Sequence, residues 1–243
     1  MPATSYKVWA WGTPVGVGVT GASYVGVAGV AKKATTSDPF IVANEVVCNA
    51  LARMLLLPCP PGATLDKGGE PYFFSLDFNL VGAALPPADP VQVVALFPRL
   101  AWGIVLFDSL VMNDDRHDRN IAHDTSTHRL QIFDHSHAFL RAGTGNINDI
   151  LANADGKLCI GNHCLAQEMF AIDGLSIWAH KIAQIPDFFI EGITESATTV
   201  GLPAAHKQDC IDFMKKRRSE IGTVAYNQID QFPKLAKASK VTP

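Results

Sequence analysis

A proline-rich stretch, residues 85–90, separates two parts of the chain that have different hydrophobic patterns. Residues 6–33 are rich in Gly and Val and predict two or three β-strands around a glycine-rich turn. After the prolines, the apolar run 91–110 predicts a long helix that bends at Pro98, because proline lacks a backbone donor. Most segments further along also have helical spacing. These patterns favour an α+β fold whose strands gather in the front part.

The two parts are expected to form two lobes, a small β-rich lobe of residues 1–80 and a larger, mainly helical lobe of residues 81–243. In the first lobe, Asp38 and Pro39 predict the start of a helix, since Asp caps helix N-termini and Pro fits the first helical position. The aromatic segment 70–78 predicts a further strand.

Composition narrows the class of protein. Apolar residues make up 48% of the chain and charged residues 18%, which excludes a disordered or fibrous protein. A net charge of −3 gives no electrostatic reason to bind nucleic acid or an anionic membrane as the main partner.

The five cysteines are scattered along the chain, which favours reduced thiols over disulfide bonds. The apolar run 100–112 is too short to cross a bilayer, and no secretory signal is seen, so we expect a cytoplasmic protein without a membrane span.

The polar loop that follows the apolar helix contains the residues best suited to chemistry. Asp115 and Asn120 lie in this loop, and Asp134 follows a short predicted strand fourteen residues after Asn120. A loop Asp can accept a proton from an attacking hydroxyl, and an Asn and a second Asp can offer oxygen to one hard cation. Mg²⁺ favours such ligands and completes its shell with phosphate and water. The pattern therefore indicates phosphoryl transfer, although a polar loop with a turn Asp would have the same spacing.

Two blocks of the sequence resemble a known family. Residues 113–120 (NDDRHDRN) followed by residues 132–135 (IFDH) resemble the D-R-x-x-N and I-D-H blocks of HipA-like kinases. They also resemble blocks of phosphatidylinositol 3-/4-kinases, which share the distant protein-kinase-like fold. The segment with Asn44 and Glu45 is similar to a helix of small HipA-like proteins. The resemblance covers roughly residues 30–140 and implies a two-lobed protein-kinase-like fold.

By this resemblance, Asp115 is the catalytic Asp that orients or deprotonates the acceptor, and Asn120 and Asp134 are the Mg²⁺ ligands. A strand lysine, Lys32 or Lys33, would contact the ATP phosphates, and Glu45 would hold that lysine in an ion pair. Alternation along a strand places the two lysines on opposite faces, so only one can point into the cleft. We favour Lys32.

Arg116 and His117 flank Asp115 and are candidates for the same catalytic set. Either could stabilise charge on the γ-phosphate, and a hydrogen bond that braces the loop is an equal alternative for each. The sequence also departs from protein kinases after Asp134, because His135 and Ser136 replace the Phe and Gly of the Asp-Phe-Gly motif.

The glycine-rich turn near the start of the chain matches the pattern G-x-G-x-x-G at Gly16, Gly18 and Gly21. Backbone amides in such a turn can cradle phosphates, and Lys32 follows at the distance that a kinase glycine loop would need. A plain β-hairpin explains the same residues equally well. The Rossmann interpretation is weaker, because no helix is predicted after Gly21.

Two other functions remain open. Five histidines lie in one segment, namely His117, His123, His128, His135 and His137. Together with nearby Asp residues they could form the site of a metal-dependent hydrolase. A kinase-like module that binds nucleotide or a partner without turnover is the second alternative.

The expected function is that of an ATP- and Mg²⁺-dependent phosphotransferase. The resemblance implies a Ser or Thr hydroxyl of a protein as the acceptor, although the same machinery would serve a lipid headgroup or a small alcohol. An antitoxin-like regulator is a further partner that the resemblance suggests. Aromatic and apolar residues around 73–78 are expected to form the adenine pocket.

Overall fold

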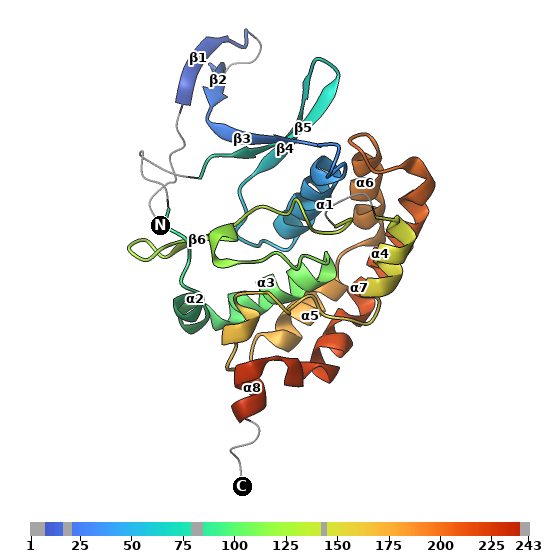
Figure 1. Cartoon of the computed structure of the whole chain (residues 1–243). Helices are drawn as coiled ribbons and strands as arrows, with labels where there is room; N and C mark the ends of the chain where they lie inside the picture. The colour runs from blue at the N-terminus through green and yellow to red at the C-terminus, as the bar shows by residue number, and fades with distance from the viewer. Residues whose placement is uncertain (1–7, 17–20, 79–84, 142–144, 239–243) are drawn as a thin grey trace.

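The computed structural model describes residues 8–16, 21–78, 85–141 and 145–238. Strands gather at one end of the molecule and most helices at the other (Figure 1). The strands of the front part are β1 (Val8–Pro14), β2 (Ser23–Val27), β3 (Gly29–Lys33), β4 (Gly62–Lys67) and β5 (Glu70–Leu76). The helices are α1 (Ile41–Met54), α2 (Pro90–Leu96), α3 (Pro98–Leu110), α4 (Ile147–Ala154), α5 (Leu175–Ala183), α6 (Asp187–Thr198), α7 (Lys207–Asn227) and α8 (Pro233–Ala238).

The central sheet of the front part is antiparallel, in the order β3-β5-β4. The strand predicted over 70–78 is confirmed as β5. Strand β4 was not predicted; it is mostly exposed, and Ala63 and Leu65 are its only apolar side chains. Strands β4 and β5 are joined by Gly68 and Gly69, whose φ angles of 67° and 84° suit glycine. Lys32 pairs with Phe73 across the sheet, and Phe73 is buried. Residues directly opposite each other share a face, so Lys32 faces the interior.

Helix α1 packs against this sheet and against α6. It begins at Ile41, two residues later than predicted, and its N-cap position is occupied by Phe40 without a side-chain cap. Asp38 instead belongs to a turn in which its backbone N–H donates to Thr35 Oγ1 at 3.0 Å. Three polar side chains of α1 are nevertheless buried, namely Asn44, Glu45 and Asn49. Buried polar groups need partners, so α1 has more than a packing role.

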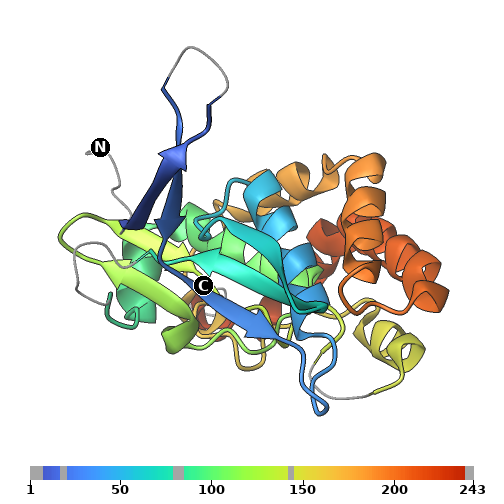
Figure 2. The ribbon, with the colours of Figure 1, turned by 90° about the horizontal axis from the view of Figure 1, so that it is seen from above.

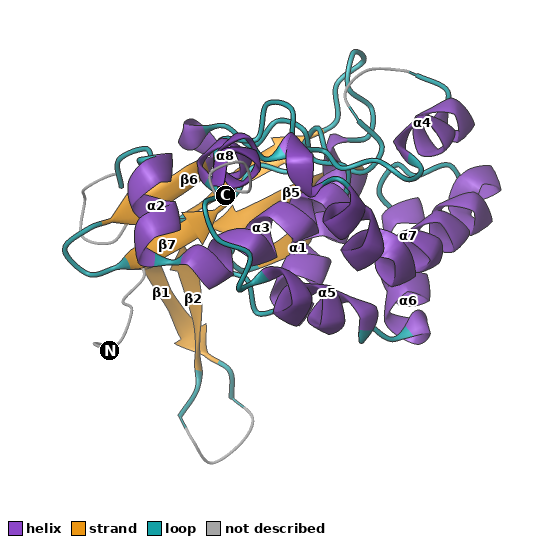
Figure 3. Ribbon diagram, turned by 90° about the horizontal axis from the view of Figure 1, so that it is seen from below, coloured by secondary structure: helices purple, strands orange, loops and turns teal. Residues whose placement is uncertain are grey.

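The long apolar helix is confirmed and is broken as predicted at Pro98. Its two halves, α2 and α3, meet at an angle of 118°. In α3 every residue from Ala101 to Leu110 is buried, and the helix is packed against α5 and α7 (Figure 3). In the described ranges, no single helix is both long and apolar enough to cross a bilayer; α2 and α3 meet that test only when taken together as a bent pair.

A second, smaller hairpin follows α3 and carries the polar loop. After a 3-10 turn (Asp118–Asn120), β6 (Ile121–Asp124) pairs with β7 (Arg129–Ile132) in antiparallel fashion. The short strand predicted before Asp134 is thus confirmed as β7. Ala122 also bridges to Pro87, in the proline-rich stretch, which ties that stretch to the hairpin.

Strands β1 and β2 form a separate two-stranded ribbon that projects from the rest of the front part (Figure 2). All of its residues are exposed, including Trp9, Trp11 and Tyr24. Gly16 and Gly21 lie near the tip of the ribbon, with φ angles of 73° and 65°.

Candidate active site

A cavity of about 330 Å³ lies between the strand-rich part and the helical part. Lys32 on β3, Glu45 on α1 and Phe73 on β5 line it from one side, and residues 132–135, at and after the end of β7, line it from the other. Segments that are distant in the sequence therefore meet around one space. Its volume is in the range of small-molecule binding sites. We refer to it as the nucleotide cavity, after the ligand that the sequence analysis predicts.

Lys32 connects the two sides of the nucleotide cavity. Its ammonium lies 2.6 Å from Glu45 Oε1 and 2.7 Å from Asp134 Oδ1, and it also donates to Ser136 Oγ at 3.0 Å. Burial by itself would lower the pKa of Lys32, but the two carboxylates outweigh burial and raise the pKa. Lys32 is therefore charged and is held by groups from both parts of the protein.

Glu45 is almost fully buried and ionised. Its Oε1 accepts from Lys32, from the backbone N–H of His135 at 3.1 Å and from Ser136 Oγ at 3.1 Å. Burial opposes the charge, but the His135 contact and the Lys32 ammonium lower the pKa of Glu45 below its usual value. Ser136, which stands where protein kinases have Gly, thus belongs to the ion-pair network.

Lys33, the alternative lysine, points the other way. It is exposed and forms an ion pair with Glu70 at 3.2 Å, beside the ring of Tyr72. The reason is strand alternation: Lys33 lies opposite Tyr72 in the register, on the face away from Phe73. Of the two lysines only Lys32 lines the cavity, and a cofactor-binding role for Lys33 has no support from its position.

The β6–β7 hairpin brings the two candidate metal ligands together. Ile121 pairs with Ile132, and the backbone N–H of Phe133 donates to the carbonyl of Asn120 at 3.2 Å. Asn120 and Asp134 therefore flank the same end of the hairpin. Asn120 Nδ2 donates to the carbonyl of Asp115 at 2.9 Å, and its Oδ1 accepts no hydrogen bond from the residues that the structure describes.

Asp134 has a second oxygen, Oδ2, for which the described residues provide no hydrogen bond. Lys32 and Ser136 outweigh burial and lower the pKa of Asp134 to about 2, so the carboxylate is charged. A carboxylate that lines the cavity and an amide oxygen from the neighbouring loop are the kinds of ligand that Mg²⁺ prefers. The φ angle of Asp134 is 60°, a strained value for a non-glycine residue.

Asp115 lies in the same loop and is half exposed. Its backbone N–H donates to Asn113 Oδ1, and its Oδ2 lies 3.6 Å from His137 Nδ1. An exposed carboxylate held at the backbone but free at the side chain can approach an incoming hydroxyl.

Arg116 is fully buried and does not line the nucleotide cavity, so a catalytic role for it stays a prediction. Its guanidinium forms two bonds with Asp108 on α3, at 2.8 and 2.9 Å, and donates to the carbonyls of Asn120 and Phe133 at 3.0 and 2.8 Å. Arg116 therefore ties the loop before Asn120 to the strand end before Asp134. These bonds fit the second role that the sequence analysis considered for Arg116, a hydrogen bond that braces the loop.

Asp108 is the anchor of this arrangement. It also accepts from Asn113 Nδ2 at 2.8 Å and from His163 Nε2 at 3.1 Å. His163 Nδ1 accepts from backbone N–H groups of residues 165 and 166, so its proton lies on Nε2. Burial would raise the pKa of Asp108, but Arg116 and His163 hold it well below the usual range.

His117 also braces the loop, because its Nδ1 accepts from the backbone N–H of Arg119 at 3.1 Å. His123 and His128 instead pack edge-on against Phe97. Within the described ranges, no group of three or more His, Cys, Asp or Glu side chains is placed to hold a metal ion. The metal-hydrolase alternative thus lacks a ligand set there.

The glycine-rich turn does not line the nucleotide cavity at the positions that are described. A side chain added at Gly16 or Gly21 would meet open space on the projecting ribbon. Gly18 lies outside the described residues. A phosphate-binding role for these glycines stays a prediction.

The segment expected to form the adenine pocket does line the cavity. Phe73 and Phe78 contribute their rings, and Phe78 stacks obliquely on Phe133, with ring centroids 5.0 Å apart. A flat heterocycle between such rings would bury apolar surface on both faces.

Asn44 is a functional candidate that received no role in the sequence analysis. Its Nδ2 donates to the carbonyl of Ser136 at 2.7 Å, and its Oδ1 accepts from the backbone N–H of Leu140 at 3.0 Å. Asn44 thus holds the segment that follows Asp134, while its neighbour Glu45 holds Lys32.

The chain resembles one solved kinase over most of its length. It aligns with the crystal structure of CtkA, a proinflammatory kinase of Helicobacter pylori, with a TM-score of 0.57 and 14% sequence identity. The alignment covers 93% of this chain and 96% of CtkA. The fold is that of a kinase. The two-part α+β architecture expected from the sequence is confirmed, whereas the lobe boundary near residue 80 and membership of the HipA-like family stay predictions.

Comparisons of sequence alone find no relative. The chain matches no protein-family model, and no curated protein is similar to it. The assignment of the site therefore depends on the geometry described above.

Proposed function

We propose that this protein is an ATP- and Mg²⁺-dependent phosphotransferase that acts on a Ser or Thr hydroxyl of a protein. The observation that carries the proposal is the meeting of Lys32, Glu45 and Asp134 at one cavity in a kinase fold. An inward lysine paired with a buried carboxylate, next to an ionised Asp, is the arrangement that a triphosphate and its cation require.

In the proposed reaction, adenine binds between Phe73 and Phe78, and Lys32 binds the phosphates. Mg²⁺, when bound, would neutralise charge on the phosphates, with Asn120 and Asp134 as its protein ligands. Asp115 accepts the proton of the acceptor hydroxyl. The acceptor oxygen forms a bond to the γ-phosphorus while the bond from that phosphorus to the β–γ bridging oxygen breaks, and ADP leaves.

The direct test is transfer of labelled phosphate from ATP, to the protein itself and to proteins of a cell lysate, with Mg²⁺ present. Asp115→Asn is the matched variant, because Asp115 makes no buried contact and its loss should not disturb the fold. Transfer by the wild type and loss in the variant support the proposal. Nucleotide binding without transfer by the wild type would instead indicate a binding module.

The two adjacent lysines provide an internal comparison. Lys32→Ala should lower kcat/KM for ATP by about a hundredfold, because a preorganised charge at the phosphates is lost. Lys33→Ala should leave kcat/KM unchanged, because Lys33 lies on the outer face with Glu70. Steady-state kinetics at varied ATP measures both, and equal effects of the two variants would contradict the assignment.

Bound nucleotide should stabilise the protein. At a hundredfold excess over Kd, Mg²⁺-ATP adds about 2.7 kcal/mol to the free energy of unfolding, which for a chain of this size raises Tm by roughly 5–10 °C. The shift should shrink when EDTA removes Mg²⁺. A Tm that does not change at millimolar Mg²⁺-ATP would contradict a nucleotide site.

A further inference from the structure

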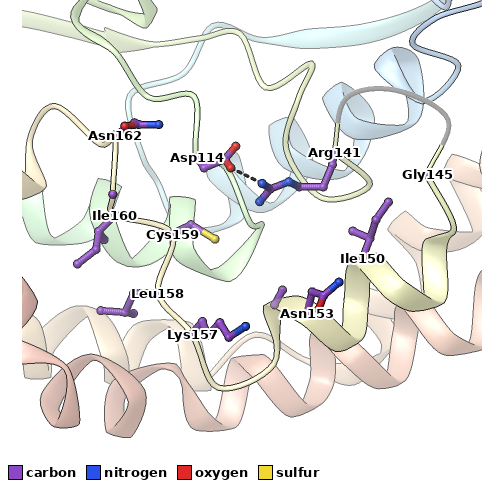
Figure 4. A pocket seen from close by; sticks show the side chains of 12 residues that line it. Asp114, Arg141, Gly145, Ile150, Asn153, Lys157, Leu158, Cys159, Ile160 and Asn162 are labelled. Carbon is purple, nitrogen blue, oxygen red and sulfur yellow. Dashed lines mark hydrogen bonds and ion pairs between the residues drawn. The ribbon is translucent and has the colours of Figure 1, made fainter.

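A second cavity, of about 500 Å³, lies beside the catalytic loop and shares no lining residue with the nucleotide cavity. Asp114, which directly precedes Asp115, lines it together with Arg141, with residues of α4 and with segment 157–162. Figure 4 shows the Asp114 and Arg141 side chains facing each other above Cys159 and Lys157. We call this space the loop cavity.

The cations of the loop cavity outnumber its anions. Asp114 and Arg141 form an ion pair, so their charges offset each other. Lys157 is exposed at the opposite wall, and its ammonium has no ion-pair partner in the described part of the chain. An anion that entered the cavity could therefore bind Lys157 and share Arg141 with Asp114.

A third cation lies behind the wall of the loop cavity. Arg217 on α7 is buried, and its guanidinium donates to the carbonyls of Ser109, Ala154 and Lys157 at 2.6, 2.7 and 2.5 Å. Ala154 and Lys157 both line the cavity.

No carboxylate within the described ranges bonds to the Arg217 guanidinium, so its charge is not neutralised by contact. Asp155, which follows Ala154 in the chain, is held by Lys216 at 2.6 Å. Burial lowers the pKa of Arg217, and Cys159, Asp155 and Glu220 offset this only in part. A buried cation without a contacting carboxylate favours an anion nearby.

The backbone that presents Arg141 is strained. Phe139 and Arg141 have φ angles of 44° and 62°, in the left-handed region that non-glycine residues rarely adopt. The segment is fixed between them, because Leu140 donates its N–H to Asn44. Strain of this kind persists only where surrounding contacts impose it, and it gathers at functional sites. Asn44, which also binds the carbonyl of Ser136, therefore fixes the segment that presents Arg141 to Asp114.

We propose that the loop cavity is the acceptor site and that it binds an anionic side chain next to the hydroxyl that receives the phosphate. The acceptor would be a polypeptide segment with an acidic or phosphorylated residue close to its Ser or Thr. A ligand whose anion binds Lys157 and Arg141 would lie beside Asp114, the residue that precedes Asp115 in the loop. This inference rests on the proposed function, because it assigns a role to the acceptor of the same reaction.

Binding of labelled peptides in the absence of nucleotide tests the inference. Four Ser-centred peptides would be titrated by fluorescence polarisation; they are identical except for Glu, phosphoserine, Gln or Lys at the flanking positions. We expect the Glu or the phosphoserine peptide to bind the wild type about tenfold more tightly than the Gln peptide. The comparison of these two peptides identifies the preferred anion.

Lys157→Glu should abolish this preference, because it replaces the unpaired cation with an anion. Arg99→Glu is the matched control, since Arg99 is exposed near the N-terminal end of α3, whereas the catalytic loop follows its C-terminal end. Equal affinities of the Glu, phosphoserine and Gln peptides, or a preference that survives Lys157→Glu, would overturn the inference. Because no ATP is present, a protein that passes this test but transfers no phosphate would contradict the phosphotransferase and leave only the binding of an anionic peptide in the loop cavity.

Discussion

Asp134→Asn is expected to lower Mg²⁺-dependent phosphate transfer by about a thousandfold while the protein stays folded. The substitution keeps the shape of the side chain but removes the charge that Lys32 and the proposed metal ion share. Asp134 is partly exposed and lies at the mouth of the nucleotide cavity, so the loss of its charge should cost little stability. Transfer of labelled phosphate and circular dichroism would measure the two effects separately.

The matched control for this variant is Asp118→Asn, which removes an exposed carboxylate from the same polar loop. Its activity should equal that of the wild type. A higher Mg²⁺ requirement in Asp134→Asn would further indicate that the carboxylate is a metal ligand. If Asp134→Asn retained full activity at low Mg²⁺, the assignment of Asp134 would be wrong.

Arg116→Met should lower the free energy of unfolding by about 3–5 kcal/mol, because it leaves the buried carboxylate of Asp108 without its main partner. For a chain of this length the change in Tm is a fall of roughly 10 °C. Two carbonyls, those of Asn120 and Phe133, also lose their donor. Denaturant unfolding measures the effect.

A surface ion pair provides the control. Lys207→Ala removes the exposed Lys207–Glu195 pair and should cost no more than about 1 kcal/mol. A double variant with Asp108→Leu and Arg116→Met should regain part of the lost stability, since no buried charge remains unpaired. If Arg116→Met were as stable as the wild type, the pair would not hold the loop.

The candidate site could be predicted where its geometry follows from local spacing. Side chains alternate between the two faces of a strand, so only one of two adjacent lysines could point inward. The hairpin between Asn120 and Asp134 is short, so the sequence alone predicts that its two ends lie close together. Only the family resemblance predicted that Glu45 would form an ion pair with Lys32. Glu45 lies on a helix, and the position of that helix relative to β3 depends on tertiary packing.

The bracing network could not be predicted in the same way. Arg116 bonds to Asp108 and to two backbone carbonyls, and His163 reaches the same carboxylate from a distant segment. The sequence does contain one signal: Asp108 interrupts an apolar helix, and a carboxylate in such a place requires a cationic partner. Which of several nearby cations provides it depends on the folded loop.

Two other features, strand β4 and the first residue of α1, are determined by tertiary contacts more than by the local sequence pattern. Strand β4 is mostly exposed on both faces, so its pairing with β5 and not the burial of one face defines it. The start of α1 shifted because Asp38 takes part in a turn with Thr35 instead of capping the helix. Local capping patterns compete with such turns, and tertiary contacts decide between them.

The contact of Lys32 with Asp134 has a consequence for the order in which ligands arrive. Without nucleotide, the aspartate already has an internal counter-ion, so free magnesium gains little by docking there. Incoming phosphates would draw the ammonium toward themselves and uncover the carboxylate at the moment when a cation is needed. Metal and nucleotide should therefore enter as one complex, each improving the affinity of the other.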